Sequence, residues 1–378
     1  MTNFIFSRKN ININHGNGVH LYTVDGTKYL DLGASYACVP AGHNHPHIIS
    51  AIQTQLEKLS YVQGSYPLSI RDDFYEKLVQ ISPGNIQNVW LCNSGTEANE
   101  AAIKFARHAT QRSQIISTRQ AFHGRTMGSL SATWKPTYKK GFGPLIPDFD
   151  FVTFGDIESL TDSISEDTAA VIVEPIQGEG GVNLPPPNYL QEVRKVTEEV
   201  GAAMILDEIQ TGLGRTGSFW NCNQTNVVPD ILTSAKGMAS GLPIGVTLCK
   251  DWIAENPGDH GSTFSGGPVI CAAGNATIDV IINENLPENA SKIGSYLLKE
   301  LKDTIGSKTR DIRGSGLLLG IEVKRGSGPI LTKLAKDHGI LALPAGKTVV
   351  RILPPLTLNR SHADDFILAM NDLSEDVL

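Results

Sequence analysis

Short apolar runs rich in β-branched residues alternate with helix-patterned stretches through the middle of the chain, and this alternation constrains the fold more than any other feature. The runs lie at residues 89–92, 114–117, 151–154, 170–174, 202–207, 231–234 and 244–249. Amphipathic stretches such as 97–109 and 189–200 separate several of them. The alternation predicts an α/β fold with a largely parallel sheet that helices cover on both faces. Ligands of such sheets bind beyond the carboxyl ends of the strands.

The two ends of the chain predict a second, smaller domain. Residues 1–45 contain the hairpin-like sequence VHLYTVDGTKYLDL, with Asp25 and Gly26 as its turn. From about Ser262 onward, helical stretches alternate with LLLGIEV and VVRILPPL, which are typical of strands. We therefore expect residues 1–45 to join a small α+β domain at 261–378, and residues 46–260 to form the large ligand-binding domain.

Composition and charge exclude several classes of function. The 378 residues are 40% hydrophobic and 19% charged, as in an ordinary globular protein with a large core. The net charge is −7 and no block of Lys or Arg occurs, which disfavours nucleic acid and membrane surfaces as partners. The first residues hold no apolar segment long enough for a signal peptide, so we expect a cytoplasmic protein. Five scattered cysteines without a CxxC pair predict buried thiols, with neither a disulfide framework nor a metal site.

The strand at 202–207 ends in two consecutive carboxylates, Asp207 and Glu208. An unpaired buried charge is costly, so Asp207 needs a partner at the edge of the sheet where ligands bind. A structural arginine and a cationic group of a ligand are both consistent with this position.

A phosphate site is predicted where the run at 89–92 leads into a helix through NSGTEANE. Ser94, Gly95 and Thr96 are small residues at a helix N-terminus, where free N–H groups and a hydroxyl bind anions. A plain N-cap is the alternative interpretation. The chain contains no GxxxxGK[ST] sequence, and no GxGxxG follows the first strand.

Two further motifs carry chemistry. Lys236 stands among small residues in TSAKGMASGLPIG, a crowded setting that lowers a lysine pKa and suits Schiff-base formation with an aldehyde. Phe122, His123 and Arg125 in AFHGRTMGSL offer an aromatic ring, an imidazole and a guanidinium. A solvated lysine, a core phenylalanine and an ordinary ion-pair arginine are the simpler alternatives.

Taken together, a phosphate cradle, a Schiff-base lysine, a flat aromatic ring and a buried carboxylate describe one ligand, pyridoxal 5′-phosphate. On this hypothesis Asp207 holds the protonated pyridine nitrogen, which keeps the ring an electron sink when the substrate loses a proton.

From about Gly18 to about Leu358 the sequence resembles the class III aminotransferases, which are fold-type I pyridoxal-phosphate enzymes. The blocks that carry the resemblance are NSGTEANE, FHGRTMGSLSATW, VEPIQGEGG, LDEIQTGLGRTG, AKGMASGLPIG, HGSTFSGG, RGSGLLLGIEV and RILPPL. The resemblance implies a mostly parallel seven-stranded sheet flanked by helices, together with the smaller α+β domain.

The resemblance also implies roles for residues that match these blocks. Lys236 is the Schiff-base lysine and proton shuttle, Asp207 pairs with the ring nitrogen, and Gln210 reaches the phenolic oxygen. Phe122 stacks on the ring. Thr263, in HGSTF, reaches the phosphate of the neighbouring subunit's cofactor, which implies a homodimer. The remaining cofactor-binding residues are Ser94, Gly95, Thr96 and His123.

Substrate recognition is expected to use two arginines, because glutamate presents two carboxylates and a terminal amine donor presents one near the site. By resemblance, Arg125 binds the distal carboxylate in both half-reactions and Arg351 binds the α-carboxylate of glutamate or 2-oxoglutarate. Glu179 pairs with Arg351 when the ω-amino substrate is bound; a permanent structural ion pair is the alternative. Tyr36 stands where ornithine aminotransferases carry a tyrosine near the substrate.

Within the family the chain looks most like acetylornithine aminotransferases and relatives that act on lysine or ornithine precursors held on LysW, an acidic amino-group carrier protein. We therefore expect transfer of a terminal amine to 2-oxoglutarate, giving a semialdehyde and glutamate, in arginine or lysine biosynthesis. Lys135, Lys139 and Lys140 are either basic residues at the entrance for the carrier or solvated surface. The competing hypotheses are ornithine or 4-aminobutyrate aminotransferase, an aminomutase or racemase on the same fold, and a non-catalytic binding protein.

Overall fold

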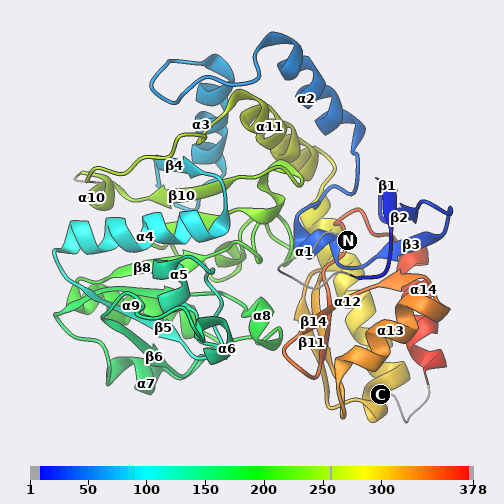
Figure 1. The fold of residues 1–378 in the computed structure, drawn as a ribbon. Helices are drawn as coiled ribbons and strands as arrows, with labels where there is room; N and C mark the ends of the chain where they lie inside the picture. Colours follow the sequence, from blue (N-terminus) through cyan, green and yellow to red (C-terminus); the bar gives the residue numbers. More distant parts are fainter. Residues whose placement is uncertain (1–8, 85, 256–257, 374–378) are drawn as a thin grey trace.

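A seven-stranded sheet forms the centre of the larger part of the molecule (Figure 1). The computed structural model describes residues 9–84, 86–255 and 258–373. The strand order is β4-β10-β9-β8-β7-β5-β6, and within this sheet β10 runs antiparallel to both its neighbours while the other pairs are parallel. The predicted mostly parallel α/β fold is therefore confirmed. The strands are β4 (Asn88–Cys92), β5 (Gln114–Thr118), β6 (Phe149–Val152), β7 (Thr168–Val173), β8 (Ala203–Asp207), β9 (Ile231–Ser234) and β10 (Gly245–Cys249).

The edge strand β6 departs from the predicted span of 151–154, because it begins and ends two residues earlier. It pairs in parallel with β5 from Phe149, opposite Ile115, to Val152, opposite Thr118. Since β5 itself ends at Thr118, the residues after Val152 have no strand to pair with. The chain then turns at Gly155, which has a φ of 82°.

Helices cover both faces of the sheet, as the packing partners of the fully buried strand β8 show. Ala203 and Ile205 lie in the same apolar cluster as Phe105 of α4 (Gly95–Thr110). Met204 and Leu206 face the other way, into the cluster that contains Leu190 and Val193 of α9 (Tyr189–Val200). Because successive strand residues point to opposite faces, β8 is sandwiched between α4 and α9.

Three helices form a separate layer beside β4, at the top of Figure 1. They are α2 (Pro46–Lys58), α3 (Ser69–Ile81) and α11 (Pro268–Asn283), and α11 packs against both of the others. Gly274 of α11 lies so close to the Phe74 ring of α3 that a Cβ at this position would be 2.6 Å from a ring carbon. α11 lies in the segment 261–378 that we expect to form the small domain, yet it packs on residues 46–81 of the expected large domain. The domain boundaries themselves remain predictions.

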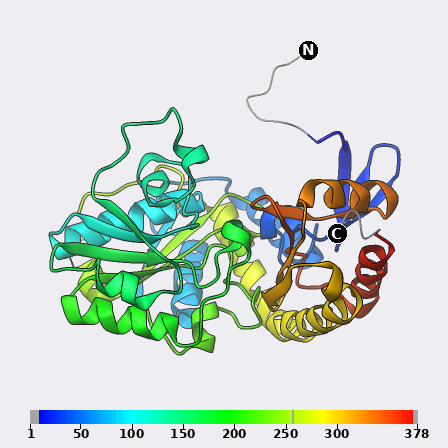
Figure 2. The same cartoon turned by 90° about the horizontal axis from the view of Figure 1, so that it is seen from below.

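Residues 9–45 and residues 286–373 lie together beside the large sheet (Figures 1 and 2). The predicted hairpin is present as β2 and β3, and β3 pairs in parallel with β13, which joins the N-terminal segment to the C-terminal part. One sheet has the order β1-β2-β3-β13 and the other β11-β12-β15-β14. Their strands are β1 (Ile13–Asn17), β2 (His20–Thr23), β3 (Lys28–Asp31), β13 (Ile340–Leu341), β11 (Asp311–Ser315), β12 (Leu318–Glu322), β15 (Val349–Ile352) and β14 (Leu343–Ala345).

The remaining helices are shorter or lie in the C-terminal part. The long ones are α12 (Leu286–Ile305), α13 (Ser327–Asp337) and α14 (Arg360–Asp372). The short ones are α1 (Ala34–Ala37), α5 (Met127–Ala132), α6 (Pro136–Lys139), α7 (Ile157–Thr161), α8 (Gly178–Gly181), α10 (Asp251–Ala254), η1 (Asn221–Gln224), η2 (Lys236–Ala239) and η3 (Gly306–Lys308). Within the described ranges, none of the helices is both long and apolar enough to span a bilayer.

Candidate active site

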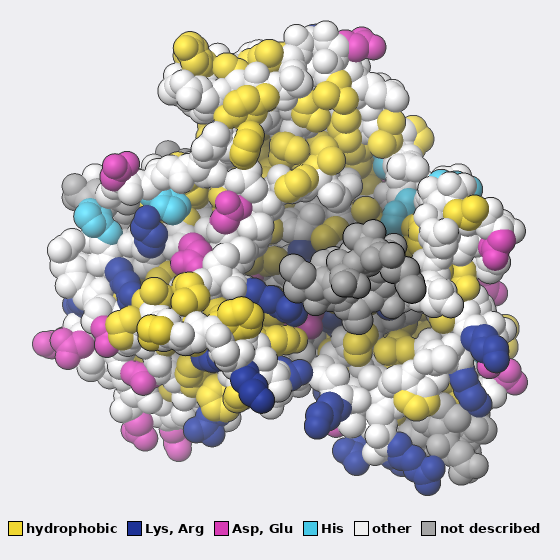
Figure 3. All heavy atoms as spheres, in the orientation of Figure 1, with side chains coloured by type: hydrophobic (Ala, Val, Ile, Leu, Met, Phe, Trp, Pro, Cys, Tyr) yellow, Lys and Arg dark blue, Asp and Glu magenta, His cyan; other side chains and the backbone are white. Residues whose placement is uncertain are grey.

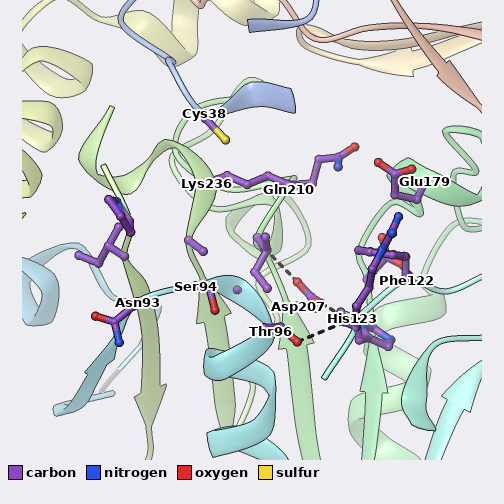
Figure 4. Close-up of a pocket in the computed structure, with 18 of the residues that line it drawn as sticks. Cys38, Asn93, Ser94, Thr96, Phe122, His123, Glu179, Asp207, Gln210 and Lys236 are labelled. Carbon is purple, nitrogen blue, oxygen red and sulfur yellow. Dashed lines mark hydrogen bonds and ion pairs between the residues drawn. The ribbon is translucent and has the colours of Figure 1, made fainter. Parts of the chain in front are cut away.

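A cavity of about 510 Å³ opens at the carboxyl ends of β7, β8 and β9 and the N-terminus of α4 (Figure 4). It collects ten of the predicted site residues, which come from separate loops of the large sheet. These are Ser94, Gly95, Thr96, Phe122, His123, Arg125, Glu179, Asp207, Gln210 and Lys236. Arg351 and Tyr36 lie next to this set without lining the cavity, and Thr263 is exposed outside it.

The N-terminus of α4 borders the cavity with small side chains. Ser94 is the N-cap, and its hydroxyl oxygen accepts a hydrogen bond from the Glu97 amide at 3.3 Å. The capping interaction that was the simpler alternative is thus present for this side chain. The amides of Gly95 and Thr96 belong to the first helical turn, where no intrahelical acceptor exists. They and the helix dipole suit an anion.

Asp207 ends β8 with only 4% of its surface exposed, and it is held by neutral or weakly basic groups rather than by an arginine. Its Oδ2 accepts hydrogen bonds from Nδ2 of Asn99 at 2.8 Å and from Nδ1 of His123 at 2.7 Å. Its Oδ1 accepts from the Ile209 amide at 3.1 Å. No ion pair with Arg or Lys involves this carboxylate among the described residues. Oδ1 therefore retains a lone pair for a further donor in the cavity.

His123 is fixed by that same carboxylate. Because Nδ1 donates to Asp207, the proton of the neutral ring is assigned to Nδ1 and Nε2 is left as an acceptor. Nε2 is buried and has no hydrogen-bond partner among the described residues. A buried polar atom of this kind calls for a bound group or a water molecule.

Lys236 opens η2 immediately after β9, with a strained positive φ of 26°. Burial lowers the pKa of its amine, while the nearby carboxylate of Glu179 opposes that shift. The neighbouring Gly237 packs so closely on Pro40 that a Cβ would lie 3.0 Å from its ring. The sequence correctly indicates a crowded setting; in addition, the carboxylates of Glu179 and Asp207 act on the amine and raise its pKa against the effect of burial.

Arg351 on β15 is fully buried and ion-paired across the cavity wall. Its Nη2 lies 2.7 Å from Oε1 of Glu179, and its Nη1 donates to Oε1 of Gln210 at 3.0 Å. Its Nε is buried without a partner in the described structure. The ring of Tyr36 lies 5.8 Å from the guanidinium carbon. Gln210, predicted to face the cofactor, thus uses its carbonyl oxygen on Arg351 and keeps its amide nitrogen for another acceptor.

Arg125 behaves differently, because aromatic rings rather than carboxylates hold it. Its guanidinium carbon lies 4.7 Å from the Tyr138 ring centroid and 5.9 Å from that of Phe122. In the part of the chain that the structure describes, no Asp or Glu lies within ion-pair distance of it. An arginine of this kind at the rim of a cavity is available for an anionic ligand.

The segment that carries Tyr36 is a left-handed helical turn. Ala34, Ser35, Tyr36 and Ala37 have φ values of 41°, 52°, 63° and 66°, and none of them is glycine. A left-handed conformation costs an L-residue roughly 1–2 kcal/mol. Strain of this size is concentrated where a site requires a particular geometry.

Some residues of the site are missed by sequence reasoning. Cys38 lines the cavity and is only half-buried, which corrects the expectation that all five thiols are buried. Asn99 bridges Asp207 and Thr233, whose hydroxyl donates to its side-chain oxygen at 2.8 Å. The signal in the sequence is that Asn99 is the one amide side chain among the apolar residues on the buried face of α4. Glu208, the second carboxylate at the end of this strand, points away from the cavity and accepts from the Cys222 amide at 2.8 Å.

The three lysines proposed for the entrance are not equivalent. Lys139 is half-buried, donates to the Ser131 carbonyl at 3.2 Å and lies over the Phe151 ring at 4.4 Å. Lys135 lies 5.3 Å from the Tyr138 ring centroid, and Lys140 is exposed. Lys139 is therefore occupied within the domain, which leaves Lys135 and Lys140 as exposed cations.

Comparisons with known proteins agree on one family. A model of the family described as aminotransferase class-III matches residues 6–373. LysW-aminoadipate semialdehyde transaminase of Deinococcus radiodurans is 38% identical over 99% of this chain and 88% of its own. Acetylornithine aminotransferase of Methanosarcina mazei is 40% identical over 96% of this chain and 91% of its own. The crystal structure of ornithine aminotransferase from Toxoplasma gondii superimposes with a TM-score of 0.93 at 30% identity, covering 97% of this chain and 91% of that one.

Proposed function

The chain belongs to the class III aminotransferases and is therefore a pyridoxal-phosphate-dependent transaminase, and we propose that it moves the terminal amino group of an N-blocked diamino acid to 2-oxoglutarate. The products are a semialdehyde and glutamate, in arginine or lysine biosynthesis. The names of the relatives support this choice, since they specify acetylornithine and LysW-linked substrates.

The donors in the cavity fit pyridoxal phosphate. When bound, the cofactor supplies an electron sink for the charge that develops when the amine-bearing carbon loses a proton. We assign the amides of Gly95 and Thr96 to its phosphate, because they are first-turn amides without intrahelical acceptors. Oδ1 of Asp207 is assigned to the ring nitrogen, since that oxygen keeps a free lone pair. The Phe122 side chain, on the cavity wall, is assigned to the face of the ring.

Lys236 is assigned the proton-transfer role, with Nζ as the atom that takes and returns the proton. An amine can do this only when part of it is neutral near pH 7, and burial lowers its pKa in that direction. The negative charge of Glu179 opposes the lowering of the Lys236 pKa, so a change in the position or charge of that carboxylate changes the pKa of the amine.

The observation that carries the substrate assignment is the ion pair between Arg351 and Glu179. Glutamate carries a carboxylate on its reacting carbon, whereas the terminal CH₂–NH₂ of a diamino acid carries none. A buried guanidinium left without a partner is costly, so Glu179 neutralises Arg351 when the terminal amine binds. When glutamate binds, its α-carboxylate takes the place of Glu179. Arg125 holds the distal carboxylate in both cases, and it has no competing carboxylate among the described residues.

A single-half-reaction assay tests the proposal. The enzyme loaded with cofactor is mixed separately with N-acetylornithine, ornithine, 4-aminobutyrate and a LysW-linked lysine, and the cofactor absorbance is followed. Fast conversion with N-acetylornithine supports a free N-blocked substrate, and conversion with only the LysW-linked amine supports a carrier-dependent pathway. Preferential reaction with free ornithine or 4-aminobutyrate contradicts the proposal.

We also propose a homodimer in which Thr263 reaches the neighbouring subunit's cofactor. Thr263 is exposed, and its carbonyl accepts a hydrogen bond from the Tyr61 hydroxyl. Hydrophobic side chains gather over the α2–α3 end of the molecule (Figure 3). The exposed apolar residues beside Thr263 and at this end are Leu56, Leu59, Tyr61, Tyr66 and Phe264. Sedimentation of a monomeric species at micromolar concentration contradicts this arrangement.

A cytoplasmic location completes the proposal. The five cysteines are all free thiols, which fits a reducing compartment. Cell fractionation with an antibody against the chain tests the location, and recovery in an exported fraction contradicts it.

A further inference from the structure

Glu174 connects two parts of the cavity wall through backbone amides. It follows β7 directly, lines the cavity and has 5% of its surface exposed. Its Oε1 accepts a hydrogen bond from the Phe122 amide at 2.9 Å. Its Oε2 accepts from the Gly178 amide at 3.3 Å. One carboxylate therefore spans two loops that are far apart in the sequence.

Each of these amides leads to a functional side chain. Phe122 carries the ring assigned to the face of the cofactor. Gly178 begins α8 and is followed by Glu179, which pairs with Arg351 at 2.7 Å. Gly178 also packs closely on the Gln210 side chain, because a Cβ at this position would lie 1.9 Å from Oε1 of Gln210. Movement of Glu174 would accordingly be transmitted to both side chains.

We propose that Glu174 is a positioning residue that fixes the distance between the Phe122 side of the cavity and the Glu179–Arg351 pair. This distance keeps Arg351, where Glu179 and the substrate carboxylate exchange, correctly placed relative to the bound cofactor. This inference rests on the proposed function. Glu174 itself takes no part in proton transfer and acts through the two amides that it holds.

Both hydrogen bonds are strongest with an ionised Glu174, because protonation turns one of its two oxygens into a hydroxyl, which is a weaker acceptor. The pKa of Glu174 is raised to about 7, mainly by burial and also by the Asp207 carboxylate, while His123, the Phe122 amide and Lys236 oppose these effects. The positioning contact is therefore complete above about pH 7, and one of its two bonds weakens as the pH falls through that value.

Glu208 provides a matched control elsewhere in the same region. It is fully buried, and it accepts from the Asn221 amide at 3.0 Å, from the Cys222 amide at 2.8 Å and from the Thr211 hydroxyl at 2.7 Å. It does not line the cavity. Loss of its carboxylate removes two hydrogen bonds from backbone amides, as in Glu174, and one from a hydroxyl, without touching the proposed coupling.

Hydrogen exchange in the cofactor-loaded and cofactor-free enzyme tests the proposal. In Glu174→Met, exchange of the Phe122 and Gly178 amides should accelerate together by about tenfold, because both acceptors are lost. In Glu174→Gln, which keeps one acceptor oxygen, only one of the two should accelerate. In Glu208→Met, acceleration should be confined to Asn221 and Cys222. Should Glu174→Met not fold, the isosteric Glu174→Gln variant carries the test.

Kinetics supply the second readout. Glu174→Gln should lower kcat/KM of the terminal-amine half-reaction several-fold more than that of the glutamate half-reaction, since only the former needs Glu179 seated on Arg351. Equal losses in both, unchanged exchange at both amides, or the same exchange pattern in Glu208→Met would overturn the proposal. The hydrogen-exchange pattern does not depend on which amine is the substrate. The inference about Glu174 can therefore be supported even when none of the proposed amino-group donors reacts.

Discussion

Nη2 of Arg351 lies 2.7 Å from Oε1 of Glu179, although the two residues are 172 positions apart in the sequence. The arginine is fully buried and the glutamate is partly exposed, so the glutamate is the partner that can swing away. An incoming carboxylate can then replace it at the guanidinium. On the proposed assignment, this asymmetry would let one cavity accept glutamate and a terminal amine in turn.

Replacing Arg351 by Ala should damage the glutamate half-reaction by about 10- to 100-fold relative to the terminal-amine half-reaction, the range expected for loss of a charge-assisted hydrogen bond. The terminal-amine substrate has no carboxylate at this position and so loses less. Rapid-mixing measurements of each half-reaction with the cofactor absorbance provide the comparison. A uniform loss would mean that Arg351 is a structural residue.

Replacing Lys236 by Ala should abolish turnover, because no other amine among the described residues lines the cavity. The fold should survive, since removal of a buried amine whose pKa is lowered by burial relieves a desolvation cost. Cofactor should still bind through the phosphate cradle at the start of α4. The check is a turnover assay together with an equilibrium cofactor titration; near-native turnover would remove the lysine from the mechanism.

Asp207→Asn should lower the catalytic rate, whereas Glu208→Gln, in the adjacent residue, should lower the stability of the fold. The first variant keeps the shape of the side chain but places an amide where the ring nitrogen is expected, so kcat should fall by at least about 100-fold. The second leaves the cavity intact and should cost roughly 1–3 kcal/mol of unfolding free energy, because one buried amide loses its acceptor. Steady-state kinetics and urea denaturation measure the two effects, and a reversed pattern would contradict the assignment.

Much of this site is indicated by strand ends. The seven apolar runs predict the seven strands of the large sheet, and the rule that ligands bind beyond their carboxyl ends brings Asp207, Lys236 and the start of α4 together. Contacts that join distant segments are different. The approach of Arg351 to Glu179 is expected only through family resemblance, since no periodicity encodes it. Glu174 likewise gives no sequence signal of the two amides that it holds.

The left-handed turn at 34–37 is the feature furthest from sequence-based expectation, because such turns ordinarily require glycine. Ser35 is exposed and has a φ of 52°. Ser35→Gly should therefore raise the unfolding free energy by about 1 kcal/mol, whereas Ser35→Ala should leave it nearly unchanged. Urea denaturation gives the unfolding free energies, provided that the dependence on urea concentration is the same in all variants. A destabilised glycine variant would mean that the turn is not strained.

The pH dependence of stability should carry the signature of Glu174. The pKa of this carboxyl is about 7 in the folded chain, above the ordinary value of 4.5, so between these values the folded state holds a proton that the unfolded state has released. Its contribution to stability is thus fully present below about pH 4.5 and is lost as the pH rises towards 7. The unfolding free energy of the wild type minus that of Glu174→Gln should fall across this window. A difference that stays flat or rises would contradict the assigned pKa.

The most direct test of the account is the rate of both half-reactions in Glu179→Gln, measured with the wild type as the reference. Neutralising Glu179 leaves Arg351 without its anionic partner when the terminal amine binds, but leaves it free for the α-carboxylate of glutamate. The account predicts at least about a tenfold loss of kcat/KM for the terminal-amine half-reaction, with the glutamate half-reaction unchanged or faster. Equal losses in the two half-reactions would contradict the exchange of carboxylates at Arg351.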